Sequence, residues 1–201
     1  MNKETRAFSF EVRAEQNEDH GTYITGTPIV FNQETDLGFC RETIAPDALK
    51  DTDLKDVRFL IGHNTSMIPL ARSRNNNEHS TMQMTVEEDG MAIRVDLDTE
   101  NNAEARALYS AVKRGDMSGM SFMFTVDKDA WEDIDSDYPK RTITSIQAAS
   151  EGDTLDSVKA SLESARKQAA EERAAQAEQE RRTALLERLK NLTEEVKQDE
   201  V

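Results

Sequence analysis

Apolar and polar residues alternate with a period of two in short segments along the first three-quarters of the chain. Phe8, Phe10 and Val12, for example, are separated by polar residues. This alternation is typical of strands that bury one face. Pro28 cannot donate to a strand ladder, so we expect an edge or a bulge at this position. The segments predicted as strands are 8–12, 22–31, 38–44, 57–61, 68–71, 82–86, 93–97, 122–126 and 142–146.

Turns and helices separate these strands. Glu88-Asp89-Gly90 predicts a hairpin turn, and the acidic residues 127–137 predict another turn. Pro46 opens a short helix. A longer helix is predicted over about 103–114, between a capping Asn102 and a terminating Gly115. Its apolar stripe consists of Ala105, Leu108, Tyr109 and Val112. The pattern predicts an α+β fold, mainly β, with short and mostly antiparallel strands in a closed or partly closed barrel.

The periodicity changes after Gly152, where both glycine and proline disappear. Residues 154–197 are rich in strong helix formers and predict one long C-terminal helix. Two leucine-containing heptad stripes, out of phase with each other, favour packing against a partner helix, and a solvated single helix is the alternative. We therefore expect a domain over 1–150, a coiled-coil or scaffold-like tail over 151–201, and a homo-oligomer, most simply a dimer.

Charge and composition exclude several classes of function. The net charge is −15, of which residues 1–153 carry −13, so a basic nucleic-acid surface is not expected. Apolar runs are too short for a membrane span, and no secretory signal is recognisable. Cys40 is the only cysteine, which excludes an intrachain disulfide and a thiolate zinc cluster. The composition predicts a cytoplasmic protein, and no motif implies a metal or another cofactor.

Two residues could supply nucleophilic chemistry. Ser121 follows a glycine-rich turn and opens an apolar run, and His63 follows the predicted strand 57–61. Strand ends can meet in a closed sheet, and histidine is suited to take a proton from a serine hydroxyl near neutral pH. Ser118 shares the turn and is a rival nucleophile, although the strand supports it less. His79 is expected to be exposed, and Cys40 is expected to lie in the core.

Several phrases of the chain occur together in the order found in one known family. The chain resembles the prohead (capsid maturation) proteases of tailed bacteriophages, which share the fold of the herpesvirus assembly proteases. The resemblance covers about residues 5–146. The phrases that carry it are Gly26-Thr-Pro-Ile-Val-Phe-Asn32, Phe39-x-x-Glu-Thr-Ile-Ala-Pro-Asp-Ala-Leu49, Val57-x-x-Leu-x-x-His63, Pro69-Leu-Ala-Arg72, Asp89-Gly-Met91 and Gly115-Asp-Met-Ser-Gly-Met-Ser-Phe-Met-Phe124.

The resemblance implies a serine endopeptidase with Ser121 as nucleophile and His63 as general base. It implies cleavage of phage scaffold and major capsid proteins inside the immature head in the host cytoplasm. It also implies that the tail is a scaffold-like or targeting arm, at which self-cleavage can occur.

The chain departs from the family pattern in two places. Met123 stands where the family often has glycine. A further strand usually follows the one that resembles 141–146, and it carries a glutamate often taken to complete the triad. Here Ile146 runs into Gln147-Ala-Ala-Ser, so this strand is expected to be missing. Glu132, Asp133 and Glu151 are the remaining acidic candidates for the third member of the triad.

Two alternatives to the active peptidase stay open. One is an inactive protease domain that acts as a capsid assembly chaperone, and the other is an acidic binding module with a dimerisation tail.

Overall fold

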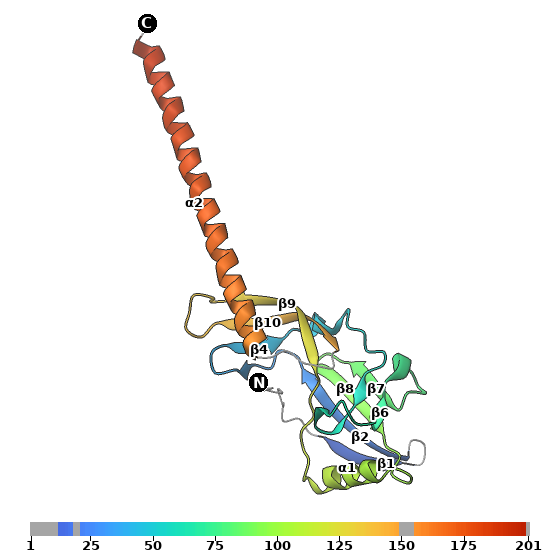
Figure 1. Cartoon of the computed structure of the whole chain (residues 1–201). Helices are drawn as coiled ribbons and strands as arrows, with labels where there is room; N and C mark the ends of the chain where they lie inside the picture. The colour runs from blue at the N-terminus through green and yellow to red at the C-terminus, as the bar shows by residue number, and fades with distance from the viewer. Residues whose placement is uncertain (1–11, 18–20, 149–154, 200–201) are drawn as a thin grey trace. The chain divides into compact units, whose positions relative to one another are not determined.

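The computed structural model describes residues 12–17, 21–148 and 155–199. The chain forms two compact units, Met1–Ser157 and Val158–Val201. The first unit contains the sheets and the short helices, and the second is a single helix (Figure 1). Most of the predicted strand 8–12 lies outside the described residues.

The first sheet is antiparallel throughout and has the strand order β1-β2-β8-β7. Figure 1 shows β2 and β8 side by side in this sheet. The register of these two strands shifts between Gly26 and Ile29, so the bulge expected from Pro28 is present. The hairpin predicted at Gly90 joins the last two strands. The four strands are β1 (Arg13–Asn17), β2 (Gly21–Val30), β7 (Met82–Val86) and β8 (Gly90–Asp96).

The second sheet has the order β3-β4-β10-β9. Strands β10 and β4 are parallel, and the other two pairs are antiparallel. The prediction of a turn over 127–137 is wrong for its first half, because these residues pair with β10 as far as Glu132. Acidic side chains are compatible with β9 because it is an edge strand with one solvated face. The strands are β3 (Thr35–Asp36), β4 (Arg41–Ile44), β9 (Phe124–Glu132) and β10 (Lys140–Ala148).

A buried ion pair links three strands of the second sheet. Arg141 in β10 donates to Glu42 in β4 at 2.9 Å and to Asp129 in β9 at 2.6 Å. The side chains of Arg141 and Glu42 are only 3% and 2% exposed. Separating the three strands in the folded chain would leave a buried charge without its partner, which is energetically costly. The ion pair therefore favours this arrangement of the three strands.

The two sheets are open, which corrects the prediction of a closed or partly closed barrel. Among the described residues, β1 and β7 form the edges of the first sheet, and β3 and β9 form those of the second. Closure requires a hydrogen-bonded partner for each edge, and alternation along the sequence does not reveal whether such a partner exists. Residues from both sheets still share one apolar core, which includes Ile24, Met91 and Ile143.

A two-stranded ribbon and three short 3₁₀ helices complete the connections. The ribbon pairs β5 (Arg58–Phe59) with β6 (Ala71–Arg72), so both are shorter than the predicted strands 57–61 and 68–71. Ile68 is 87% exposed, and Pro69 after it has no N–H to donate, so this part of the predicted strand does not pair. The 3₁₀ helices are η1 (Pro46–Leu49), η2 (Ile61–His63) and η3 (Arg74–Asn76).

Both predicted long helices are present. Helix α1 (Ala103–Arg114) is capped by the Asn102 side chain, which accepts from two backbone N–H groups, and Gly115 ends it in the left-handed conformation. Helix α2 (Leu155–Asp199) has 45 residues, and every side chain over 171–187 is exposed. No helix within the described residues has a stretch long and apolar enough to cross a bilayer.

Candidate active site

His63 lies in a tight turn directly after the ribbon strand β5. Gly62 and His63 have φ angles of 58° and 55°, so two consecutive residues occupy the left-handed region. This conformation costs roughly 1–2 kcal/mol for a residue with a Cβ, and glycine alone adopts it without strain. The turn is closed by the Asn64 N–H, which donates to the Ile61 carbonyl at 3.2 Å. The backbone therefore fixes the direction of the histidine side chain.

Ser121 lies on the segment that leads from the end of α1 to the start of β9. Gly115 turns the chain at the helix end, and its N–H donates to the Val112 carbonyl at 3.0 Å. Strand β9 begins at Phe124, three residues later than the run expected to open at Ser121. The adjacent Met120 side chain lies over Gly26 of β2, where a Cβ would come within 3.2 Å of its Cε. The bulged strand of the first sheet therefore supports the serine segment.

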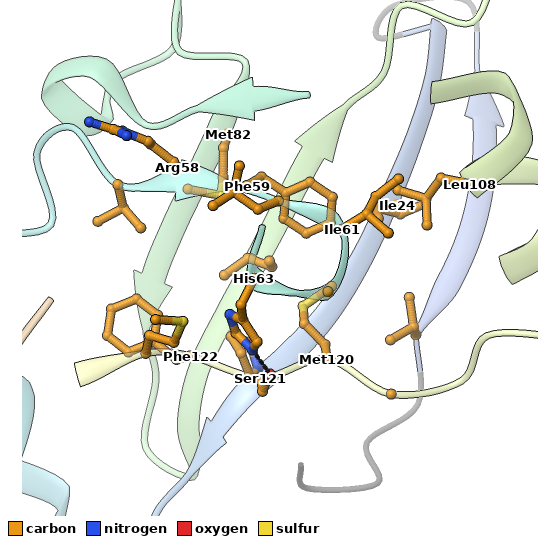
Figure 2. A pocket seen from close by; sticks show the side chains of 18 of the residues that line it. Ile24, Arg58, Phe59, Ile61, His63, Met82, Leu108, Met120, Ser121 and Phe122 are labelled. Carbon is orange, nitrogen blue, oxygen red and sulfur yellow. Dashed lines mark hydrogen bonds between the residues drawn. The ribbon is translucent and has the colours of Figure 1, made fainter. Parts of the chain in front are cut away.

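The fold brings these two segments together. His63 Nε2 and Ser121 Oγ are 2.5 Å apart, and Figure 2 shows the hydrogen bond between them. The two residues are 58 positions apart in the sequence, and both are half-buried. A serine hydroxyl within hydrogen-bonding distance of an imidazole can lose its proton as it attacks a carbonyl. This geometry is that of a nucleophile and its base.

Burial affects the charge state of the histidine. Desolvation lowers the pKa of His63 below its ordinary value of 6.5, because a buried imidazolium loses the stabilisation that water provides. The ring is therefore neutral at neutral pH. A neutral Nε2 that accepts from Ser121 requires the proton to be on Nδ1.

No side chain in the described part of the chain hydrogen-bonds Nδ1 of His63. Glu132 pairs instead with Lys140, at 3.8 Å, and Asp133 occupies the left-handed turn between β9 and β10. Glu151, the other acidic candidate, lies outside the described residues. Residues 149–154, between β10 and α2, where the family's further strand was expected to be missing, also lie outside the described residues. The third member of a triad therefore has no candidate among the described side chains.

The other residues considered from the sequence lie apart from this pair. Ser118 is exposed and does not line the cavity next to Ser121. His79 is exposed and lies 3.5 Å from the Glu78 carboxylate. Cys40 is fully buried, as expected of a core residue. Among the described residues, no group of three His, Cys, Asp or Glu side chains could hold a metal ion.

A cavity of about 600 Å³ opens beside the Ser121–His63 pair. Its walls come mainly from β2, β5, β7, β8, α1, the η2 turn and the serine segment, with Val12 and Ala148 of β10 in addition, and they are mostly apolar. Sequence patterns did not reveal this cavity, because its residues are scattered over many segments far apart in the sequence, and most of them are typical of an ordinary core. The alternating methionines in 82–86 were the only available signal, and they indicated a strand.

Comparison with known proteins identifies the class. The profile of the caudovirus prohead serine proteases matches residues 8–151, which is most of the chain and includes both His63 and Ser121. The chain belongs to this family, so it is a phage prohead protease at family level. No curated protein and no solved structure gives a significant match.

Proposed function

We propose that the chain is a serine endopeptidase that cuts scaffold and major capsid proteins during prohead maturation, with Ser121 as nucleophile and His63 as general base. The observation that carries this proposal is the 2.5 Å contact between His63 Nε2 and Ser121 Oγ. Membership of the prohead protease family supports the substrate class and the location inside the immature head.

The proposed reaction begins when Ser121 Oγ attacks the scissile carbonyl carbon and its proton passes to His63 Nε2. The imidazolium then returns this proton to the leaving amine, and an acyl-enzyme remains on Ser121. Water, deprotonated by the same nitrogen, hydrolyses the ester and regenerates the hydroxyl. The depressed pKa of His63 favours the first step, because the ring is neutral and able to accept a proton.

Replacing the proposed nucleophile tests this assignment against its rival. Ser121→Ala is expected to reduce cleavage of a co-expressed capsid precursor by at least about 10³-fold, since the nucleophile is lost. Ser118→Ala is the matched control, because it removes the same atom from an exposed residue of the same segment and is expected to retain most of the activity. Cleavage is measured by gel and by mass spectrometry of the fragments. Equal loss in both variants would contradict the assignment of Ser121.

A second function is favoured by the unpartnered Nδ1 of His63 in the described part of the chain. A histidine without an orienting acceptor is a weaker base, and loss of that acceptor can cost about 10⁴-fold in rate. The alternative is a protease-like domain that guides capsid assembly without cutting. Incubation of the purified chain with capsid precursor separates the two functions. A defined, Ser121-dependent fragment supports the peptidase, and assembly promoted equally by Ser121→Ala without any fragment supports the chaperone.

We also propose that the charged, mostly polar helix α2 serves as a scaffold-like or targeting arm, and that copies of the chain associate through it. Its exposed Leu185 and Leu186, at 62% and 53%, support a surface that a partner helix can cover. Comparing the molecular mass in solution of the full chain and of Leu185→Glu/Leu186→Glu tests this point. The same mass for both, at the value of one chain, would exclude association through these residues.

A further inference from the structure

The cavity beside Ser121 is larger than hydrolysis itself requires. Acyl transfer needs a hydroxyl, a base and room for one carbonyl group, whereas this cavity measures about 600 Å³. It continues from the reacting pair between β2, β7 and α1, where Ile24, Met82 and Leu108 line it (Figure 2). A volume of this size is typical of a site that receives part of a ligand.

Methionine is the most frequent residue type in the lining of the cavity. Five of the eight methionines in the sequence contribute to it, from strand β7 and from the serine segment: Met82, Met84, Met117, Met120 and Met123. Methionine has three rotatable bonds and a polarisable thioether, so a surface made of it adapts to apolar groups of different shapes. Such a wall favours acceptance of several apolar side chains over strict selection of one.

Charged groups are confined to the rim. Apart from the imidazole, the only ionisable side chains that line the cavity are Asp56 and Arg58, and both residues are exposed. The Asp56 carboxylate is already paired with the Arg72 guanidinium. A charged substrate side chain would therefore lose its water deep in the cavity without gaining an ionic partner, which is costly.

We propose that this cavity is the specificity site of the peptidase and receives a large apolar side chain of the substrate, from the residue that supplies the scissile carbonyl. During attack this carbonyl carbon must lie within about 3–3.5 Å of Ser121 Oγ. The side chain of the same residue is attached to the Cα atom next to this carbonyl carbon. It can therefore extend into the adjoining cavity. Leucine, methionine and phenylalanine are all accepted, whereas aspartate and lysine are rejected. This inference rests on the proposed function of Ser121.

A binding experiment tests the cavity independently of catalysis. The full chain is labelled with ¹³C at the methionine methyl groups and titrated with N-acetyl-leucinamide. The methyl resonances are followed by NMR during the titration. The five cavity methionines are expected to shift, whereas Met67 and Met91, which do not line the cavity, serve as internal controls. N-acetyl-aspartamide is expected to bind at least about 10-fold more weakly. Shifts confined to the control methyls, no shifts, or equal shifts with both compounds would overturn the proposal.

A cleavage experiment then tests specificity with a matched pair of variants. Met82→Ala removes a buried side chain from the cavity wall, and Met91→Ala removes one of equal size that is buried elsewhere, so both variants lose core contacts. A peptide library is digested, and the cut sites are identified by mass spectrometry. Met82→Ala is expected to raise kcat/KM for phenylalanine and tryptophan relative to leucine by about 10-fold, and Met91→Ala is expected to leave this ratio unchanged.

The outcomes separate the two levels of the proposal. Cleavage that persists in Ser121→Ala would contradict the proposed function. Ser121-dependent cleavage without a preference for apolar residues, or with the same change in both methionine variants, would contradict the specificity site alone. If the library stays uncut, the methyl titration still decides whether the cavity takes apolar side chains.

Discussion

At the scale of single residues, the site depends on backbone conformation as much as on side-chain chemistry. His63 is held in the left-handed region next to Gly62, and this conformation directs its ring toward Ser121. Strained positions of this kind persist only where the surrounding structure enforces them, and they cluster at functional sites. The ribbon β5–β6 and the turn at Asn64 provide that enforcement.

The protonation of His63 predicts the pH dependence of activity. Its pKa is lowered by burial, and the base must be neutral, so kcat/KM is expected to fall on the acid side with a midpoint below 6.5. The pH profile of Ser121-dependent peptide hydrolysis measures this midpoint. A midpoint at 7 or above would show that a negative partner, absent from the described side chains, stabilises the imidazolium.

The same shift affects stability in a defined direction. The unfolded state protonates His63 near pH 6.5, whereas the folded state binds this proton only at lower pH. The unfolded chain therefore binds more protons in this window, and the contribution of His63 to the free energy of unfolding decreases as the pH falls. His63→Gln, which cannot titrate, is expected to reduce this part of the pH dependence in denaturant titrations. If the free energy of unfolding of His63→Gln changes with pH between 5 and 6.5 as steeply as that of the unchanged chain, the predicted contribution of His63 is contradicted.

At the scale of elements, the first sheet supports the serine segment through one close contact between strands. A Cβ on Gly90, at the start of β8, would lie 2.2 Å from the Ile29 carbonyl oxygen of β2. Only glycine allows this approach. The contact lies at the bulge of β2, which also places Gly26 beneath Met120, the residue before Ser121.

Substitution at this contact is expected to destabilise the sheet. Gly90→Ala forces the two backbones apart and is expected to lower the free energy of unfolding by about 1–3 kcal/mol. Gly38→Ala is the control: its Cβ would meet no atom within 4 Å, so only its positive φ angle of 85° costs energy, roughly 1 kcal/mol. Urea denaturation followed by tryptophan fluorescence compares them. If Gly90→Ala lowers the free energy of unfolding by less than Gly38→Ala does, the two strands can move apart at this contact at little energetic cost.

At the scale of the whole molecule, the two units differ in what stabilises them. Residues from both sheets form the apolar core of the unit Met1–Ser157, whereas every side chain of α2 over 171–187 is exposed. A helical stretch without buried apolar side chains relies on local propensity and on pairs four residues apart, such as Gln176 with Glu180. Most helical stability in proteins comes from tertiary packing, which this stretch lacks within its own chain.

Hydrogen exchange is expected to reveal this difference. In a dilute sample, backbone amides over 171–187 should exchange at least about 100-fold faster than those of β2 and β8, since they open locally without global unfolding. Protection that rises with protein concentration would support association through the helix. Slow exchange at all concentrations would contradict a solvated single helix and show that the stretch is covered by another surface.

The sequence by itself determined the local elements. Alternation identified the hairpin of β7 and β8, and capping signals placed α1 between Asn102 and Gly115, because these features depend on neighbouring residues alone. The order of phrases also indicated the family, whose match spans residues 8–151. Both residues of the candidate pair, His63 and Ser121, were identified from the sequence, and their catalytic roles remain predictions.

Only the tertiary structure decided how these elements combine. The sheets are open, and β9 extends to Glu132, because pairing between distant strands fixes edges and strand lengths, and local patterns do not encode it. The 2.5 Å contact of His63 with Ser121 and the methionine-lined cavity also depend on segments far apart in the chain. Long-range packing sets such distances, so residue types could suggest the chemistry of the site but not its geometry.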